Sequence, residues 1–404
     1  MDLLEDIFQA YYEARRHKRN TVNQLRFEID LEENLIALYE EIRDRKYTIG
    51  HSTCFMVDYP VKREVFAADF RDRVVHHLVV GYLNSFIERQ LIYDCYSCRK
   101  GKGTLFGINR LEHHIRSCSE NFQRECYVLK LDLKGYFMRI NRKKLSAFLN
   151  RIILRYADCK DKNGVKFRDS YRFDLLTYLL PVILYNDPTG NCVFKGKPSD
   201  WDGLPPSKSL FHSPKDCGLP IGNLTSQLFS NVYLNAFDQY VKRELKVRHY
   251  GRYVDDFFLI DRDKKRLLDL LPKIRDYLEE SVGVQLHPNK IYLQRIDKGV
   301  CFLGTYLKPF RRYILNRTVG HFVLHLKSFD RWVRTKNVRQ EELEQMRAVM
   351  NSYLGVLQRT RTYRIKRKLF SFPCELFRYG YLNGRMEIFV LYPDYKRRDD
   401  VVEG

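Results

Sequence analysis

Two adjacent acidic residues interrupt a run of apolar and aromatic residues near the middle of the 404-residue chain. Asp255 and Asp256 stand in the segment Gly-Arg-Tyr-Val-Asp-Asp-Phe-Phe-Leu-Ile, whose two flanks have the composition of short buried strands. This pattern predicts a β-hairpin with both aspartates in its tight turn. Two like charges at the tip of an apolar hairpin repel each other and lose hydration, so a divalent cation would stabilise them. A solvent-exposed Asp-Asp turn without a metal is the alternative for this segment.

A third acidic residue, Asp132, ends another β-prone segment, Tyr-Val-Leu-Lys-Leu-Asp-Leu-Lys-Gly-Tyr-Phe. A turn through Gly135 is expected to follow this strand. If the two strands are neighbours in one sheet, Asp132 faces Asp255 across a small gap. These two carboxylates, with the backbone carbonyl of Leu133 and with Asp256 in support, are the predicted ligands of two Mg²⁺ ions. Two ions held in this way can activate a hydroxyl group and stabilise a leaving pyrophosphate.

The Tyr-Val-Asp-Asp string, with Leu-Asp-Leu-Lys-Gly-Tyr-Phe upstream and Gly-Leu-Pro-Ile-Gly-Asn between them, resembles the palm motifs of reverse transcriptases. The likeness extends to segments that resemble the fingers motifs and the closing palm motifs of that family, at 66–77, 93–104, 289–290 and 302–304. It covers roughly residues 55 to 310. The resemblance implies an RNA-directed DNA polymerase that uses dNTPs and two Mg²⁺ ions.

Within that family, the segment Leu-Pro-Ile-Gly-Asn-Leu-Thr-Ser-Gln is similar to the enzymes of diversity-generating retroelements, as is Cys-Arg-Lys-Gly-Lys-Gly-Thr. Most reverse transcriptases carry glutamine where this chain has Ile221. The likeness implies mutagenic retrohoming, in which a template-repeat RNA is copied into cDNA with errors at template adenines. It also implies a small basic accessory variability protein, oligomeric in that family, as a partner. The alternatives are a group II intron-like or retron-like reverse transcriptase and a non-catalytic RNA-binding scaffold.

The resemblance implies an α+β fold of the right-hand polymerase type, with fingers, palm and thumb. The palm is expected to be an antiparallel sheet backed by helices, and the thumb to be helical. The expected parts are an N-terminal helical segment (1–50), the fingers (51–126), the palm (127–309) with an insertion of loops and turns (about 155–217), and a basic helical thumb (310–404).

The chain has a formal net charge of +21, which suits RNA, cDNA and triphosphates as partners. Residues 311–404 hold 20 basic and 10 acidic residues, so their net charge is +10. Ten cysteines lack paired spacing, and the pair Cys95 and Cys98 has no second pair with which to bind zinc. The start of the chain is acidic, unlike a signal peptide, and no apolar stretch is long enough to span a membrane. These features predict a cytoplasmic protein with reduced thiols.

Seven residues are expected to bind the incoming dNTP, namely Lys62, Arg63, Arg71, Tyr136, Ile221, Gly222 and Lys290. Tyr136 occupies the position that the family uses as a steric gate against a 2′-hydroxyl, although an ordinary core tyrosine fits the sequence as well. The fingers cations would grip the triphosphate, and their alternative is a structural or solvated role. Lys290 would act near the pyrophosphate, or else lie on the surface. The absence of glutamine at Ile221 is expected to loosen selection at template adenines.

Nine residues are expected to contact nucleic acid, namely Arg99, Lys100, Lys102, Asn223, Gln227, Arg361, Arg364, Lys366 and Arg367. The first three lie in a glycine-containing fingers segment that fails the Walker spacing and therefore suits a template backbone better than a nucleotide phosphate loop. The last four belong to a segment with six basic residues in ten, which suits an RNA–DNA backbone. A solvated helix face is the alternative for that segment.

Overall fold

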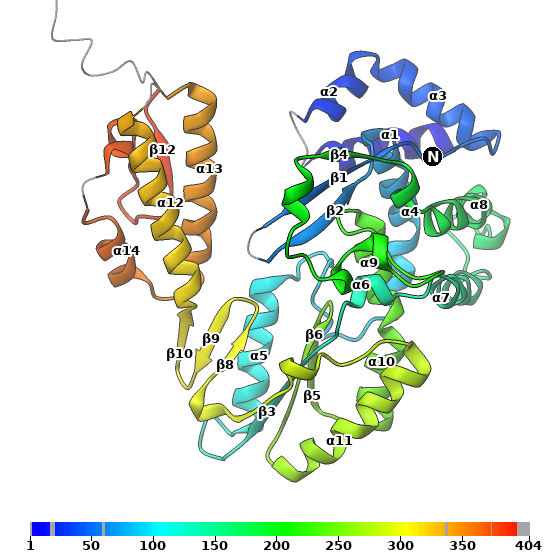
Figure 1. Ribbon diagram of the computed structural model, residues 1–404. Helices are drawn as coiled ribbons and strands as arrows, with labels where there is room; N and C mark the ends of the chain where they lie inside the picture. Colours follow the sequence, from blue (N-terminus) through cyan, green and yellow to red (C-terminus); the bar gives the residue numbers. More distant parts are fainter. Residues whose placement is uncertain (1, 17–20, 59–60, 336–337, 373, 394–404) are drawn as a thin grey trace, which may run out of the picture. The chain divides into compact units, whose positions relative to one another are not determined.

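The computed structural model describes residues 2–16, 21–58, 61–335, 338–372 and 374–393. Helices and strands are mixed along the chain, so the fold belongs to the α+β class that was predicted (Figure 1). Within the described residues, none of the helices combines the length and the apolar character that crossing a membrane requires.

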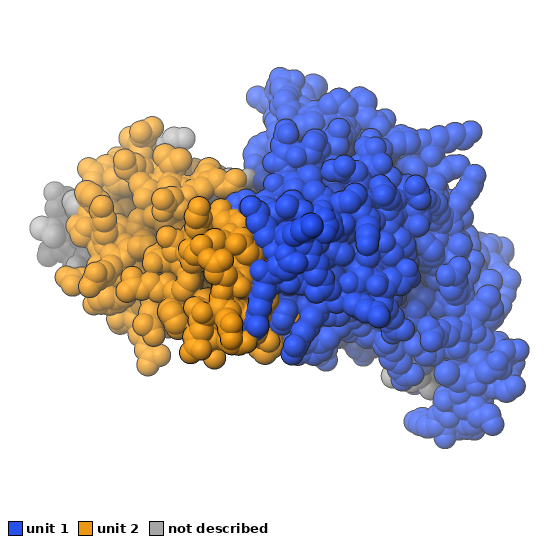
Figure 2. Space-filling model, turned by 90° about the horizontal axis from the view of Figure 1, so that it is seen from below, with its two compact units in different colours: residues 1–110, 128–293 blue, residues 111–127, 294–404 orange. Residues whose placement is uncertain are grey.

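The chain divides into two units (Figure 2). The first is formed by residues 1–110 and 128–293, and the second by residues 111–127 and 294–404. This division does not separate the predicted fingers from the predicted palm. The four expected parts, at 1–50, 51–126, 127–309 and 310–404, therefore stay predictions.

Three helices open the first unit: α1 (Leu3–Arg15), α2 (Val22–Ile29) and α3 (Leu31–Arg43). Asp2 caps α1, because its carboxylate accepts the backbone N–H of Glu5 at 2.9 Å. The helices α1 and α3 turn the apolar side chains of Ile7, Leu35 and Leu38 into the core. The remaining helices of this unit are α4 (Phe70–Glu88), α6 (Tyr136–Arg139), α7 (Arg142–Arg155), α8 (Tyr171–Tyr185), α9 (Leu224–Tyr233), α10 (Asn235–Gln239) and α11 (Lys264–Tyr277), while α5 (Thr104–Cys118) runs from the first unit into the second.

A three-stranded sheet lies in the part predicted as fingers, with the strand order β2-β1-β4. Strand β1 (Ser52–Val57) pairs with β2 (Arg63–Ala67) antiparallel and with β4 (Cys192–Lys195) parallel. Strand β4 comes from the insertion, which the sequence predicted to be loops and turns. That prediction was wrong for β4 and also for α8, whose five leucines recur at helical spacing and are buried.

A four-stranded sheet has the order β5-β6-β3-β7. Strands β5 (His249–Tyr253) and β6 (Asp256–Asp261) form an antiparallel hairpin in which Tyr253 is opposite Asp256. Strand β3 (Tyr127–Asp132) lies beside β6, and β7 (Tyr292–Arg295) lies on its other side. The sequence predicted this neighbourhood of the two acid-bearing strands. Residues 257–260 are all buried, which is expected of a strand covered on both faces.

The second unit combines strands and helices. Its three-stranded sheet has the order β10-β9-β8, formed by β8 (Val300–Phe302), β9 (Thr305–Lys308) and β10 (Arg311–Ile314). Helices α12 (Asn316–Thr335), α13 (Gln340–Leu357) and α14 (Tyr363–Leu369) follow, together with the hairpin β11 (Gly380–Leu382) and β12 (Phe389–Leu391). The core of this unit includes the buried side chains of Phe322, Met350 and Leu354. The expected helical thumb therefore also contains β-structure.

Candidate active site

The hairpin turn between β5 and β6 consists of Val254 and Asp255, and Asp256 is already the first residue of the returning strand. The prediction that both aspartates lie in the turn is corrected accordingly. Val254 has φ +56°, a left-handed conformation that costs a β-branched residue about 1–2 kcal/mol. The surrounding structure must therefore hold this turn in place.

A buried arginine, Arg252, stabilises the turn at Val254 through a hydrogen bond. Arg252 has no exposed surface, and its Nη1 donates to the carbonyl oxygen of Val254 at 2.8 Å. Its Nε and Nη2 lie 2.8 and 2.6 Å from the carboxylate oxygens of Asp238, which is equally buried. Tyr250 donates its hydroxyl to the same carboxylate at 2.6 Å. The charge of Arg252 is thus compensated by Asp238, while its Nη1 binds the backbone of the turn.

Two further side chains complete this support. Ser97 Oγ accepts the backbone N–H of Val254 at 3.2 Å and donates to Asn231 Oδ1 at 2.9 Å. Asn231 Nδ2 donates in return to the carbonyl of Ser97 at 2.8 Å, and both residues are fully buried. Sequence reasoning missed Asp238, Asn231, Ser97 and the role of Arg252. The one available signal was a set of charged and polar residues inside otherwise apolar segments.

The two predicted metal-binding acids, Asp132 and Asp255, are close enough to interact electrostatically. Burial, and then the charge of Asp132, raises the pKa of Asp255 to about 6. Two cations work in the opposite direction, Lys290 and Arg63. Lys290 Nζ lies 3.0 Å from both carboxylate oxygens of Asp132. The site therefore concentrates negative charge that is only partly balanced by the protein.

Asp256 differs from its neighbour because its carboxylate pairs with Lys130 at 3.2 Å. Burial raises its pKa to about 7, against the opposing effect of Lys130. Its second oxygen, Oδ1, is buried and has no hydrogen-bond partner within the described residues. A buried carboxylate oxygen without a donor is costly unless another cation or donor reaches it.

These donors suit magnesium. Among the residues that the structure describes, no three His, Cys, Asp or Glu side chains are grouped so as to form a metal site by themselves. Mg²⁺ typically takes only one or two protein carboxylates and completes its shell with water and substrate phosphates. Asp132 and Asp255 supply two hard oxygen donors of this kind, and the unsatisfied Oδ1 of Asp256 belongs to the next residue, at the start of β6.

Tyr136, the expected steric gate, is 2% exposed, and its hydroxyl donates to the carbonyl of Ser230 at 2.6 Å. Burial raises its pKa well above the ordinary value, and Asp255 adds to the rise. It follows Gly135, which has φ +57° and where a Cβ atom would lie 2.5 Å from the carbonyl oxygen of Ser207. The predicted turn through Gly135 is therefore present, and it aims the Tyr136 ring into the protein.

The segment of Ile221 and Gly222 packs against the fingers sheet. The carbonyl of Ile221 accepts the backbone N–H of Phe66 at 2.8 Å, and its side chain is half-buried against the apolar cluster around Phe66. Gly222 has φ +123°, and a Cβ there would lie 2.8 Å from Val65 Cγ1. Glycine is thus required for close approach to β2. Asn223 is 7% exposed and accepts the Ala68 N–H at 3.2 Å, so its predicted contact with nucleic acid is corrected to a structural role.

The three fingers cations have different surroundings. Arg71 donates to the carbonyl of Thr48 at 3.0 Å and pairs with Glu41, so its guanidinium is occupied within the protein. Lys62 Nζ donates to the carbonyl of Asp202 at 2.8 Å. Arg63 is exposed on β2 and lies within electrostatic range of Asp255. Arg63 is the most exposed of the three, and the dNTP contacts predicted for all three stay predictions.

The predicted nucleic-acid set divides by exposure. The arginine side chain of Arg99 is 7% exposed and donates to Glu88 at 2.9 Å, and Lys366 is 6% exposed. Both are corrected from contacts with nucleic acid to structural residues. Lys102 Nζ lies over the ring of Tyr93 at 4.4 Å. The exposed members of the set are Lys100, Gln227, Arg361, Arg364 and Arg367.

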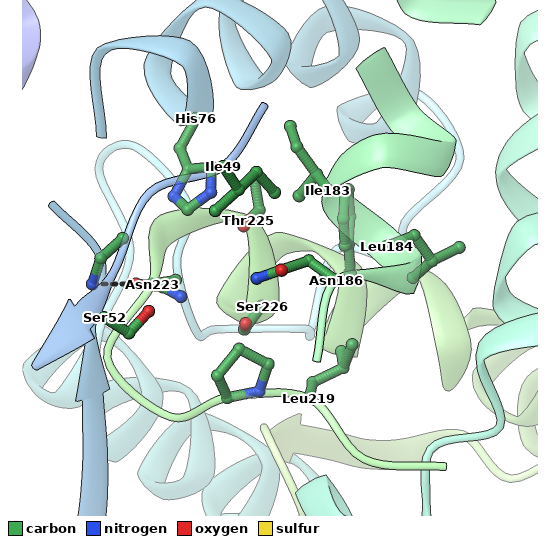
Figure 3. A pocket seen from close by; sticks show the side chains of 13 residues that line it. Ile49, Ser52, His76, Ile183, Leu184, Asn186, Leu219, Asn223, Thr225 and Ser226 are labelled. Carbon is green, nitrogen blue, oxygen red and sulfur yellow. Dashed lines mark hydrogen bonds between the residues drawn. The ribbon is translucent and has the colours of Figure 1, made fainter. Parts of the chain in front are cut away.

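A cavity lies behind the Ile221 segment, between α4, α8 and α9 (Figure 3). Its lining includes His76, Asn223 and Ser226. Burial lowers the pKa of His76 to about 3, so the imidazole is neutral, and its Nδ1 has no hydrogen-bond partner among the described residues. None of the residues that line this cavity is Asp132, Asp255 or Asp256, so it is separate from the proposed metal site.

No protein-family model matches the chain. Among curated proteins, Protein YkfC of Escherichia coli (strain K12) is 23% identical over 266 residues, which cover 58% of this chain and 60% of YkfC. Among solved structures, apo telomerase from Candida tropicalis aligns over 81% of this chain and 60% of its own, with a TM-score of 0.48 and 11% identity. Telomerase from Candida albicans, in complex with a TWJ fragment of telomeric RNA, aligns over 86% and 62%, with a TM-score of 0.46 and 13% identity. The chain thus spans about three fifths of the length of each of these similar proteins.

Proposed function

We propose that the protein is an RNA-directed DNA polymerase of the right-hand type, and that it belongs to a diversity-generating retroelement. The observation that supports this most is the proximity of Asp132, at the end of β3, to Asp255, in the turn that leads into the neighbouring strand β6. The Tyr-Val-Asp-Asp and Leu-Asp-Leu-Lys-Gly-Tyr-Phe strings that contain them resemble reverse-transcriptase motifs. The motif likeness and the proximity of the same two carboxylates both support a polymerase active site.

In this proposal Asp132 and Asp255 hold two Mg²⁺ ions, with the carbonyl of Leu133 as a further ligand and Asp256 in support. When bound, the ions would activate the primer 3′-hydroxyl and stabilise the leaving pyrophosphate. Lys290 is close enough to Asp132 to steady the charge of the triphosphate on the same side. Arg63, the first residue of β2 in the three-stranded sheet, would contact the phosphates of the dNTP.

The remaining residues would select and orient the substrates. Tyr136, which is buried and hydrogen-bonded to Ser230, would help to exclude a 2′-hydroxyl as part of the packed wall beneath the sugar. Ile221 would leave the nascent base pair without the amide contact that glutamine supplies elsewhere, and errors at template adenines would follow. Lys100, Gln227 and the exposed arginines of α14 would contact the template RNA and the cDNA.

The test of this function is cDNA synthesis on a defined RNA, with dNTPs and Mg²⁺, with and without a candidate small basic accessory protein, followed by sequencing. Errors concentrated at template adenines would support the retroelement assignment. Faithful cDNA would keep the polymerase and reject that subfamily in favour of an intron-like or retron-like enzyme. RNA binding without any cDNA, in both conditions, would favour a non-catalytic scaffold.

A further inference from the structure

Three aromatic side chains gather beside the fingers sheet, and we call them the aromatic platform: Phe194, Trp201 and Phe211. Phe194, on the edge strand β4, is 57% exposed, and Phe211 is 41% exposed. Their rings are stacked, with centroids 5.8 Å apart and planes at 17°, and Trp201 meets Phe194 edge-on at 5.5 Å. Large aromatic side chains exposed together in this way usually mark a binding surface.

A buried acid fixes the platform in place. Glu64 of β2 is 1% exposed and accepts the indole N–H of Trp201 at 3.0 Å. The same carboxylate accepts the hydroxyl of Ser209 at 3.0 Å and the backbone N–H of Leu210 at 2.7 Å. Trp201 and the two residues just before Phe211 are thereby attached to β2. Rings held in advance lose little entropy when they bind a partner.

The platform is continuous with the segment that is proposed to meet the template. Phe211 contacts Phe66 at a centroid distance of 5.6 Å, and Phe66 donates its backbone N–H to Ile221 at 2.8 Å. Trp201 and Ile221 both pack against the same small apolar cluster. The platform and the Ile221 segment therefore pack on the same part of the fingers sheet.

The charges around the platform favour a polyanion. Lys195, Lys197 and Lys208 are all exposed. Residues 191–212 contain two acids, Asp200 and Asp202, and the carboxylate of Asp200 accepts the backbone N–H of Lys197 at 2.8 Å. Exposed aromatic rings interleaved with lysines are typical of surfaces that bind single-stranded nucleic acid, on which bases stack.

We propose that the aromatic platform binds the unpaired template RNA ahead of the active site, with bases stacked on Phe194 and Phe211 and phosphates near the three lysines. This inference rests on the proposed function only in that the bound RNA is taken to be the template of the polymerase. Binding of single-stranded RNA to this surface is a separate property, and it can be measured without catalysis. Addition of a partner's β-strand to the edge of β4 is the competing use of the same surface.

The experiment measures the binding of a short unstructured RNA, and of a blunt RNA–DNA duplex, to the full chain by fluorescence anisotropy. Phe194→Ala and Phe211→Ala should each weaken single-strand binding by about five- to fiftyfold and leave duplex binding unchanged. Phe194→Trp should retain binding, because it preserves a stacking surface. The matched control is Tyr12→Ala, which removes a 59%-exposed ring from α1.

Salt dependence distinguishes the two contributions. The aromatic substitutions should lower affinity equally at every salt concentration, whereas Lys195→Ala with Lys197→Ala should reduce the slope of log affinity against log salt by about one. Unchanged single-strand binding in both aromatic variants would overturn the platform, even if the chain synthesises cDNA. Weakened binding in a chain that makes no cDNA would overturn the polymerase and leave the platform as an RNA-binding surface.

Discussion

Arg252 and Asp238 form an ion pair in which neither side chain has any exposed surface, with Arg252 Nη2 2.6 Å from Asp238 Oδ2. Removing one partner of such a pair typically costs about 3–5 kcal/mol, because a buried charge is left uncompensated. The same guanidinium holds the carbonyl of Val254, the residue before Asp255. The position of the proposed catalytic carboxylate therefore depends on charges that lie entirely inside the protein.

The first prediction concerns the strained turn. Ser97→Ala removes the hydroxyl that accepts the Val254 N–H and should lower kcat of cDNA synthesis about fivefold, the value of roughly one hydrogen bond. Val254→Gly in that background should restore most of the loss, because glycine adopts φ +56° without strain. Single-turnover rates of the two variants and of the exposed control Ser199→Ala measure this. Equal loss in the single and double variants would contradict it.

The second prediction concerns stability. A carboxyl with a folded pKa near 6 and an unfolded value near 3.8 binds its proton more tightly when folded, so stability falls as pH rises from about 4 to about 6. Asp255→Asn removes this penalty and should stabilise the metal-free protein by about 3 kcal/mol at pH 8 while abolishing synthesis. Urea unfolding with and without Mg²⁺ measures both effects. The ion should stabilise the native chain more than the variant, and a variant less stable than the native chain at pH 8 would reject this account.

The third prediction concerns Lys290, whose Nζ lies 3.0 Å from Asp132. Lys290→Ala should lower kcat/KM for dNTPs about tenfold or more, because it removes a cation beside the site. Lys290→Arg should keep part of the activity, since it retains the charge but changes its geometry. Lys273→Ala, on the exposed face of α11, is the control. Steady-state kinetics in which Lys290→Ala and the control behave alike would remove Lys290 from the site.

The fourth prediction concerns fidelity. Ile221→Gln should reduce the error frequency at template adenines several-fold, since a gain of about 1 kcal/mol in discrimination has that effect. The half-buried position of Ile221 against the Phe66 cluster makes its thermal stability a necessary companion measurement. Sequencing of cDNA from one RNA template gives the error spectrum. An unchanged adenine spectrum in a folded, active variant would separate Ile221 from fidelity.

Local patterns were enough to predict the two acid-bearing strands, the turn through Gly135 and the helices of the N-terminal part. Strongly apolar strands and a required glycine leave few alternatives, and a local pattern reports them directly. The helix α8 was missed because the turn residues that follow it, at 187–190 and 203–206, outweighed its leucine spacing. Strand β4 is short and has exposed residues, so it lacks the periodicity by which strands are recognised.

Long-range pairing explains what the sequence could not predict about the site. Asp238 follows α9 and gives no local sign that it will compensate Arg252, which lies fourteen residues later. Arg99 and Lys366 were expected to face nucleic acid because their neighbours are basic, but both side chains are buried. Charge along a sequence reports composition, whereas the direction of each side chain depends on what packs against it.

Primer extension on a defined RNA template tests the central claim most directly, with the native chain, Asp132→Asn, Asp255→Asn and the exposed control Asp269→Asn compared in Mg²⁺. We expect extension by the native chain and the control, and a loss of at least about a thousandfold in each of the two site variants. RNA binding should persist in all four proteins. Extension by Asp132→Asn or Asp255→Asn at the native rate would contradict the proposed active site.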